Sequence, residues 1–255
     1  MDIIVHANEL LKNKVPFCLV TVVTSGVKGF LPGQKAIILD DGAMVGAFGS
    51  EQFDQKICSC ARRYLQQRKS SITWFEDKLE LFFNVIAAEA KLLICGAGHI
   101  AVPLAQFSDQ AGFQVTVLDD RPDFANESRF PGCKIIAEDF IIALSDMTLG
   151  PTTFVVVITR GHEHDNECLQ VLLKQTSAYV GLIGSRRRVR IVLEMLKTEG
   201  IPQKRLDEIF TPIGIPIGAE SPVEIAISIV SELVCVRRKG WQQARALRAA
   251  IGVDK

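Results

Sequence analysis

The chain has 255 residues, which is enough for one large domain or two modest ones. Basic and acidic residues number 29 each, and this balance gives no support for a nucleic-acid or membrane-surface partner. No apolar run reaches the roughly 18 residues needed to cross a bilayer. The first residues also lack the features of a secretion signal. We therefore expect a cytoplasmic protein, in which the seven cysteines are buried, reduced thiols.

Residues 1–88 predict a small, β-rich α+β domain. Strands are expected at 17–24, 35–39, 43–48, 72–75 and 79–86, in two hairpins that turn at residues 40–42 and 76–78. Between the hairpins, apolar residues with helical spacing predict a helix over 52–67. Residues 87–90 form the only candidate hinge.

Residues 89–255 predict a Rossmann-type domain, because strand and helix patterns alternate as they do in a parallel sheet with right-handed crossovers. Strands are expected at 91–95, 113–118, 134–137, 153–158 and 178–183. Helices are expected at 99–111, 139–145, 164–175, 187–199 and 222–238. The basic tail, 239–255, is compatible with a helix that forms a solvated face or a packing arm.

A glycine-rich loop follows the first of these strands. Gly96, Gly98 and Ala101 match G-x-G-x-x-A, in which the glycines allow a tight turn and a close approach of backbone to phosphate. The start of the next helix favours an anion, so we expect a phosphate site that includes His99. Asp119 ends the second strand at a spacing typical of a carboxylate that binds ribose.

The residues around that carboxylate leave the ligand open. Asp120 and Arg121 follow Asp119 directly. Carboxylates accept hydrogen bonds and arginine donates them in a plane, so the three residues suit either a ribose or a pterin ring.

A second polar loop, Thr159-Arg-Gly-His-Glu-His-Asp165, follows the hydrophobic strand at 153–158 and should reach the same crevice. His162 and Asp165 could join His99 in a mononuclear metal site. With only four histidines in the chain, we favour another interpretation, in which Asp165 caps the helix and His162 contacts ligand or backbone.

Two later loops point to the same edge. Ser185 and three arginines begin a helix, where one of the arginines is a candidate anion clamp and the other two are expected to be solvated. Residues 212–222 are rich in glycine and proline and lead into a helix that Ser221 is expected to cap.

Five motifs taken together resemble the XdhC/CoxI family of accessory proteins for molybdenum hydroxylases such as xanthine dehydrogenase. In chain order they are GAGHIA, VTVLDDRPDFANESRFPG, ITRGHEHD, YVGLIGSRRR and PIGIPIGAESPVEIAISIVSELV. The resemblance is strong over 91–238 and weaker over 16–86. It implies a Rossmann domain behind a smaller N-terminal domain. It also implies binding of molybdenum cofactor, its protection during sulfuration by a cysteine desulfurase, and its delivery to the client hydroxylase by a homodimeric chaperone.

The resemblance also suggests which residues bind the cofactor. The positions that match the family's motifs are Gly96, Gly98, His99, Asp119, Asp120, Arg121, His162, Asp165, Ser185, Arg186, Gly214 and Glu220.

The N-terminal half departs from the family pattern. Gln52 stands where the family usually has a cysteine suspected of touching the cofactor, and an amide cannot replace a soft thiolate ligand. Either Cys58 or Cys60 substitutes for it, or the chain binds the cofactor differently, or it does not carry it.

Two other functions compete with the accessory protein. The glycine loop would also serve an NAD(P)-dependent oxidoreductase, although no catalytic acid is evident. A metal-dependent hydrolase would use His99, His162 and Asp165. Since no nucleophile–base pair can be assigned, we favour a binding protein over an enzyme.

Overall fold

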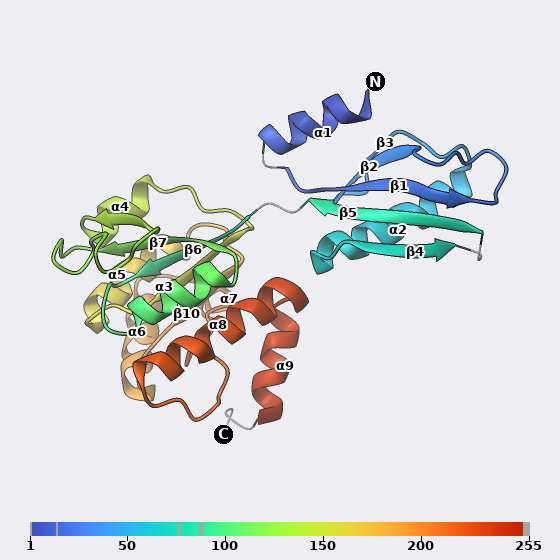
Figure 1. Cartoon of the computed structure of the whole chain (residues 1–255). Helices are drawn as coiled ribbons and strands as arrows, with labels where there is room; N and C mark the ends of the chain where they lie inside the picture. Colours follow the sequence, from blue (N-terminus) through green and yellow to red (C-terminus); the bar gives the residue numbers. More distant parts are fainter. Residues whose placement is uncertain (1, 14, 76–77, 87–88, 252–255) are drawn as a thin grey trace. The chain divides into compact units, whose positions relative to one another are not determined.

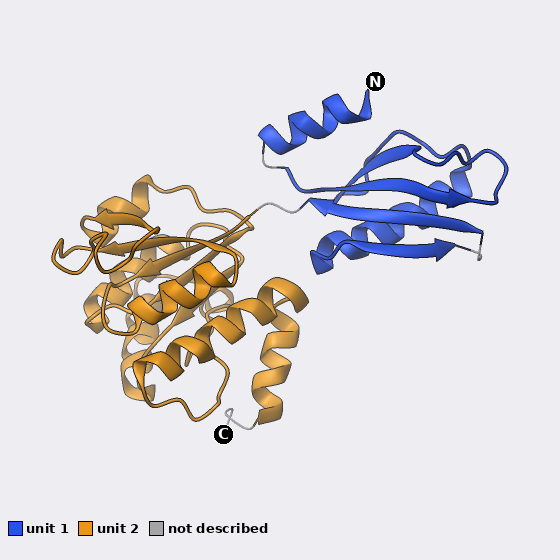
Figure 2. Ribbon diagram, viewed as in Figure 1, with its two compact units in different colours: residues 1–88 blue, residues 89–255 orange. Residues whose placement is uncertain are grey.

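The computed structural model describes residues 2–13, 15–75, 78–86 and 89–251. The chain divides into two compact units, residues 1–88 and 89–255, which we call unit 1 and unit 2 (Figure 2). Unit 1 contains an antiparallel sheet and unit 2 a parallel one, which confirms the predicted fold class. Residues 76–77 of the expected turn, 87–88 of the expected hinge and 252–255 of the tail lie outside the described residues.

Unit 1 is a five-stranded sheet in the order β3-β2-β1-β5-β4 (Figure 1). Its elements are α1 (Ile3–Lys12), β1 (Phe17–Ser25), β2 (Lys35–Leu39), β3 (Met44–Val45), α2 (Glu51–Gln67), β4 (Ser71–Phe75) and β5 (Leu79–Ile86). Helix α2 buries Ile57, Ala61 and Leu65 on one face of the sheet. The strand expected over 43–48 is much shorter than predicted.

Helix α1 is a feature that sequence reasoning missed. It places Ala7 and Leu10 against Phe17 and Ile37 on the face of the sheet opposite α2. Asp2 caps the helix by accepting a hydrogen bond from the backbone N–H of Ile4 at 2.9 Å. The cap and the two inward residues were the available signals.

Unit 2 is a five-stranded parallel sheet in the order β10-β9-β6-β7-β8. Its elements are β6 (Ala90–Cys95), α3 (Ala101–Gln110), β7 (Phe113–Asp119), β8 (Lys134–Ala137), α4 (Phe140–Asp146), β9 (Thr153–Val157), α5 (His162–Leu172), β10 (Tyr179–Leu182), α6 (Arg186–Thr198), α7 (Gln203–Leu206), α8 (Pro222–Lys239) and α9 (Trp241–Ile251). The short helix α7 was not predicted.

Both faces of this sheet are buried, which explains the continuous apolar run of β9. One core joins the sheet to α3 and α8, and the other joins it to α4, α5 and α6. Beyond β10, Phe210 pairs with Gly181 in parallel, so the chain leads from there to the same edge as the strands. None of the described helices is long and apolar enough to span a membrane.

The strand order fixes where a ligand site would form. The chain proceeds from β6 to β8 in one direction and then returns to place β9 on the other side of β6. In such sheets the crevice lies at the carboxyl ends of the two strands beside this reversal. The loops after β6 and β9 therefore define the candidate site.

Candidate functional site

The loops after β6 and β9 touch each other at Gly96. Its φ is +112°, a left-handed conformation that favours glycine, and a Cβ there would lie 2.4 Å from the carbonyl oxygen of Ile158. The Gly96 N–H donates to the carbonyl of Leu118 at 2.7 Å. Gly98 has open space around its missing side chain. The first glycine is thus required for packing, whereas the second leaves room for a ligand.

Asp119 fixes the shape of the glycine loop. Its side chain is 1% exposed and accepts hydrogen bonds from the N–H of Ala97 at 2.7 Å and from Nε of Arg121 at 2.8 Å. Burial by itself raises the pKa of Asp119, but the hydrogen bonds from Arg121 and Ala97 more than offset it, and the net pKa is lowered. A contact between Asp119 and ribose stays a prediction, since both carboxylate oxygens already have donors.

The loop after β7 is fastened to the glycine loop by a residue that sequence reasoning missed. Nη1 of Arg129 donates to the carbonyl oxygens of Ala97 and Phe124, each at 2.9 Å. The Arg121 guanidinium stacks on the same loop, with its carbon 3.8 Å from the centre of the Phe124 ring. Arg129 lies within the ANESRF part of a quoted motif, but spacing alone gives it no role.

An ion pair between Asp120 and Arg160 connects the loop after β7 to the loop after β9. Arg160 donates hydrogen bonds to both carboxylate oxygens of Asp120, with Nη2 lying 2.8 Å from Oδ2. The Arg160 side chain is 39% exposed and the Asp120 side chain 26%. The hydrogen bond from Arg160 lowers the pKa of Asp120 to about 2. Because β6 lies between β7 and β9 in the sheet, this pair crosses the position of the glycine loop.

The prediction that Asp165 caps α5 is wrong. The helix begins at His162 with Gly161 at the cap, so Asp165 lies within the first turn and is fully buried. It accepts hydrogen bonds from Oγ1 of Thr159 and Nε of Arg188, both at 2.6 Å. Burial raises the pKa of Asp165, and the hydrogen bonds from Thr159 and Arg188 only partly offset that effect.

The histidines are differently placed. His99 and His162 are exposed, and each follows a glycine at the start of a helix, α3 or α5. Nδ1 of His164 lies 2.9 Å from a Glu167 oxygen. Within the described residues, no three His, Cys, Asp or Glu side chains gather in a way that could hold a metal ion. The hydrolase hypothesis therefore lacks a ligand set, because Asp165 is committed to Thr159 and Arg188.

At the start of α6, the arginine that enters the site is Arg188. Ser185 caps the helix by accepting a hydrogen bond from the Arg188 N–H at 3.3 Å. Nη2 of Arg188 also donates to the Thr159 carbonyl at 3.0 Å. Arg186 is exposed and lines a separate hollow of about 260 Å³. The binding role that the family resemblance gives Arg186 stays a prediction, and Arg188, which was expected to be solvated, is instead paired with Asp165.

Gly214 serves a buried network. A Cβ on Gly214 would lie 2.3 Å from Oγ of Ser228, and its N–H donates to Oε1 of Glu232 at 3.0 Å. Glu232 is fully buried, accepts a hydrogen bond from the Tyr179 hydroxyl, and is paired with Arg248 at 3.0 Å. The network positions the loop that follows Phe210, and sequence reasoning missed it.

Glu220 belongs to the start of α8. Its N–H and that of Ser221 donate to Oε2 of Glu224 at 3.0 and 2.9 Å, and Ser221 accepts from the Glu224 N–H. This confirms the predicted cap, in the form of a capping box. The exposed side chain of Glu220 keeps its binding role only as a prediction.

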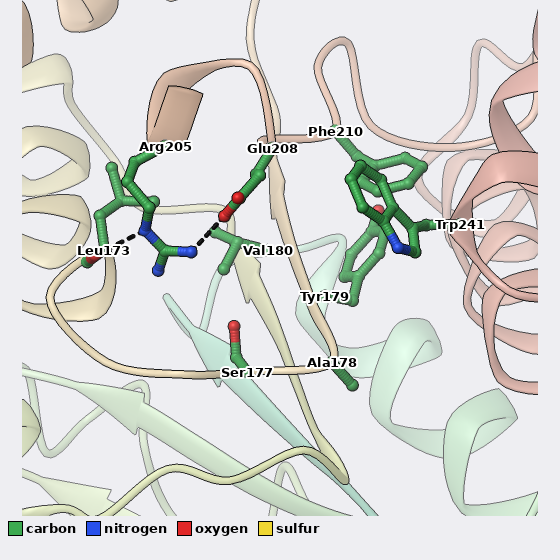
Figure 3. Close-up of a pocket in the computed structure, with 9 residues that line it drawn as sticks. All are labelled: Leu173, Ser177, Ala178, Tyr179, Val180, Arg205, Glu208, Phe210 and Trp241. Atoms are coloured by element: carbon green, nitrogen blue, oxygen red, sulfur yellow. Dashed lines mark hydrogen bonds and ion pairs between the residues drawn. The ribbon is translucent and has the colours of Figure 1, made fainter. Parts of the chain in front are cut away.

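A pocket of about 220 Å³ lies at the other edge of the sheet, around the start of β10. Figure 3 shows Tyr179, Phe210 and Trp241 on one side and the Arg205–Glu208 ion pair on the other. Arg205 also donates to the carbonyls of Leu173 and Gln175, so each of its three side-chain nitrogens already has a partner within the chain. This pocket is separate from the loops after β6 and β9.

In unit 1, Gln52 is exposed in the first turn of α2. Cys58 lies about 9 Å farther along the helix at 1.5 Å per residue, and its Sγ donates to the Gly42 carbonyl at 3.4 Å. Cys60 is partly buried and contacts the core under α2. Neither thiol occupies the position of Gln52.

With this geometry established, the comparisons with known proteins identify the family. The XdhC Rossmann domain family matches residues 92–233, more than half of the chain. The chain belongs to the XdhC family. The match covers the glycine loop, the Asp119 and Asp165 clusters, and the loop that contains Gly214.

Two individual relatives are similar to this chain. The chain is 33% identical over 170 residues to a probable subunit of xanthine dehydrogenase from Bacillus subtilis (strain 168), covering 65% of this chain and 48% of that protein. It is 29% identical over 257 residues to "Uncharacterized protein YqeB" of Escherichia coli (strain K12), covering 93% of this chain and 46% of that protein. The chain thus spans about half the length of these relatives.

A solved structure extends the likeness to both units. A crystal structure described as a xanthine dehydrogenase from Bacillus halodurans matches with a TM-score of 0.69 at 25% identity. The match covers 96% of this chain and 69% of that chain. The similarity therefore includes the N-terminal unit, where the sequence motifs are weakest.

Proposed function

We propose that this chain is an XdhC-type accessory protein for a molybdenum hydroxylase such as xanthine dehydrogenase. In this proposal, the loops after β6 and β9 bind the phosphate of the molybdenum cofactor or of a related nucleotide. Membership of the XdhC family and the relatives named as xanthine dehydrogenase or part of it support the client class. The role of the loops rests on their geometry.

The supporting observation is a pair of Gly-His steps at two helix starts. Gly98-His99 precedes α3 and Gly161-His162 begins α5, and no side chain caps either helix. The two loops are in contact through Gly96 and Ile158. Uncapped N–H groups and the positive ends of helices favour a phosphate, and two exposed imidazoles supply further donors. The ligand would replace the missing caps.

The residues fit the phosphate of the cofactor better than its metal. The partly exposed Asp120–Arg160 pair offers an acceptor and a planar donor for a pterin or a base. The cysteines nearest to these loops in the sequence, Cys95 at the end of β6 and Cys168 within α5, are fully buried. When bound, the cofactor would supply the client's molybdenum centre, and the chain's own residues would hold and orient the organic part.

The localisation, the oligomeric state and the other partners of this accessory protein are also proposals. We expect a cytoplasmic protein that forms a homodimer and meets a cysteine desulfurase as well as its client. The NAD(P)-dependent oxidoreductase is the main competitor because it would use the same loop. The saturated hydrogen bonding of Asp119 argues against the usual ribose contact.

The experiment is purification after co-expression with the enzymes of molybdenum cofactor synthesis, followed by oxidation and measurement of pterin fluorescence. We expect bound pterin in the wild type and at least a tenfold loss in the double variant His99→Ala/His162→Ala. His6→Ala, which removes a histidine of α1 in unit 1, is the matched control.

Two results would oppose the proposal. Absence of pterin from the wild type, under conditions in which a loaded relative retains it, would reject cofactor binding. A rise in NAD(P)H fluorescence on titration, lost in the same double variant, would instead support the oxidoreductase.

A further inference from the structure

The pocket at the start of β10 has an aromatic wall, which Figure 3 shows. Tyr179 and Phe210 are buried, and their ring centres lie 4.7 Å apart. Trp241, the first residue of α9, lines the same pocket and is 46% exposed. The guanidinium of Arg245 lies over the rings of Phe210 and Trp241, with its carbon 4.9 and 5.2 Å from their centres. The wall therefore joins a buried floor to an exposed indole ring.

The aromatic floor is held in place by the rest of unit 2. The Tyr179 hydroxyl donates to the buried Glu232. The Phe210 N–H donates to the carbonyl of Val180 at 2.9 Å, which fixes Phe210 beside β10. A pocket with walls fixed in this way needs little reordering when a rigid ring enters, and such preorganisation favours binding.

The opposite wall is polar, and most of its groups are already bonded. Arg205 donates to the carbonyls of Leu173 and Gln175 at 2.9 and 2.8 Å, and it is paired with one carboxylate oxygen of Glu208. Among the residues that the structure describes, the other Glu208 oxygen and the Ser177 hydroxyl have no hydrogen-bond partner. A carboxylate oxygen and a hydroxyl thus remain available to a ligand.

The size and charge of the pocket limit what it can hold. Its volume of about 220 Å³ is below the roughly 300–1,000 Å³ of pockets for drug-sized ligands. A fused ring system suits this space better than a whole nucleotide does. The cation among the lining residues, Arg205, is already paired with Glu208, so the pocket does not favour a phosphate.

We propose that this pocket binds a planar, uncharged heterocycle of the size of a free purine or pterin ring. The ring stacks on the exposed indole of Trp241, because an aromatic side chain offers a platform to the face of any such ring. A ring N–H donates to the free oxygen of Glu208, and a ring nitrogen or carbonyl bonds to the Ser177 hydroxyl. The two hydrogen bonds select a heterocycle over a hydrocarbon ring.

The first test uses tryptophan fluorescence, since the chain has only two tryptophans. Trp74 lies on β4 of unit 1, so in Trp74→Phe the indole signal comes from Trp241 alone. We expect adenine to quench this signal at millimolar concentration or below. AMP should need at least a tenfold higher concentration, because the pocket lacks space and charge for its ribose phosphate.

The second test compares variants by titration calorimetry on the full chain, with adenine and with a soluble pterin to show which ring is preferred. Trp241→Leu should raise the dissociation constant at least fivefold, because it removes the stacking platform. Trp74→Leu, at the other exposed tryptophan, is the matched control and should leave it unchanged. Ser177→Ala should raise it about threefold or more and should fold normally, since its hydroxyl has no partner among the described residues.

Two results would overturn the proposal. One is that neither ring binds the wild type at millimolar concentration. The other is binding that Trp241→Leu and Ser177→Ala both leave unchanged, and its loss in His99→Ala/His162→Ala would then assign the ring to the loops after β6 and β9. The inference does not rest on the proposed function, because the double histidine variant should bind adenine in this pocket as the wild type does.

Discussion

The helices at the carboxyl edge of the unit 2 sheet begin in two different ways. α4, α6 and α8 are each capped by a side chain of their own sequence, from Asp139, Ser185 and Ser221. α3 and α5, which follow the two strands at the topological reversal, have no such cap. At this edge of the sheet, the two helix starts without a side-chain cap are those that adjoin the candidate site, where a bound anion could satisfy the free N–H groups.

The largest expected effect concerns the ion pair that joins an uncapped helix to a capped one. Arg188→Ala should lower the free energy of unfolding by about 3 kcal/mol or more at neutral pH, because it leaves the buried Asp165 without its cation. The loss should be smaller near pH 4, since the raised pKa of Asp165 favours its neutral form there. Denaturant titration at both pH values measures this. Arg187→Ala, at the exposed neighbour, should change stability little.

The two glycines of the α3 loop should separate folding from binding. Gly96→Ala should cost about 3 kcal/mol, the sum of left-handed strain and a clash with Ile158. Gly98→Ala has space for its Cβ and should remain stable, but it should reduce pterin retention by crowding the approach to phosphate. A Gly98→Ala protein that retains pterin fully would contradict a phosphate contact there.

Removing the N-cap of α8 should lower stability and leave binding unchanged, the reverse of the effect expected for Gly98→Ala. Ser221→Ala deletes half of the capping box of α8 and should lower stability by about 1 kcal/mol, as N-cap losses do. Pterin retention should be unchanged, since this helix start is already satisfied. If Ser221→Ala abolished binding while the protein stayed folded, the distinction between capped and uncapped helices would fail.

The smallest effect is a pH dependence. Asp120 has a folded pKa of about 2, below its unfolded value of about 3.9. Its contribution is therefore present above about pH 4 and is lost as pH falls toward 2. Because the pair with Arg160 is partly exposed, we expect no more than about 1 kcal/mol. Unfolding free energies of Asp120→Asn and wild type should converge across this range. A gap that persisted at pH 2 would assign the effect to another cause.

Much of unit 2 could be predicted because its central strands, β6 and β9, are almost entirely buried and the turn after β6 contains glycine. The runs at β6 and β9 and the G-x-G loop leave few alternatives to a parallel sheet. The α6 arginines show where sequence reasoning ends. Arg186, Arg187 and Arg188 look alike in sequence, and only the helix start at Ser185 directs the third toward Asp165.

Other site features depend on contacts distant in sequence. Asp165 resembles a helix cap locally, but its carboxylate is drawn to Arg188 on the next helix. Glu232 looks like one polar position on α8, and its partners Tyr179 and Arg248 come from β10 and α9. Three-dimensional packing, which periodicity does not encode, decides both cases.

The buried Glu232–Arg248 ion pair gives helix α9 a structural role inside unit 2. Arg248 neutralises a carboxylate that also holds the N–H of Gly214, so α9 supports a loop of the carboxyl edge through the interior of unit 2. A protease that cut at Gly240 would remove the counter-charge of a buried acid as well as a helix. Truncation there should loosen the Gly214 loop, because α9 supplies the only cation, among the described residues, that is paired with the buried Glu232 carboxylate holding this loop.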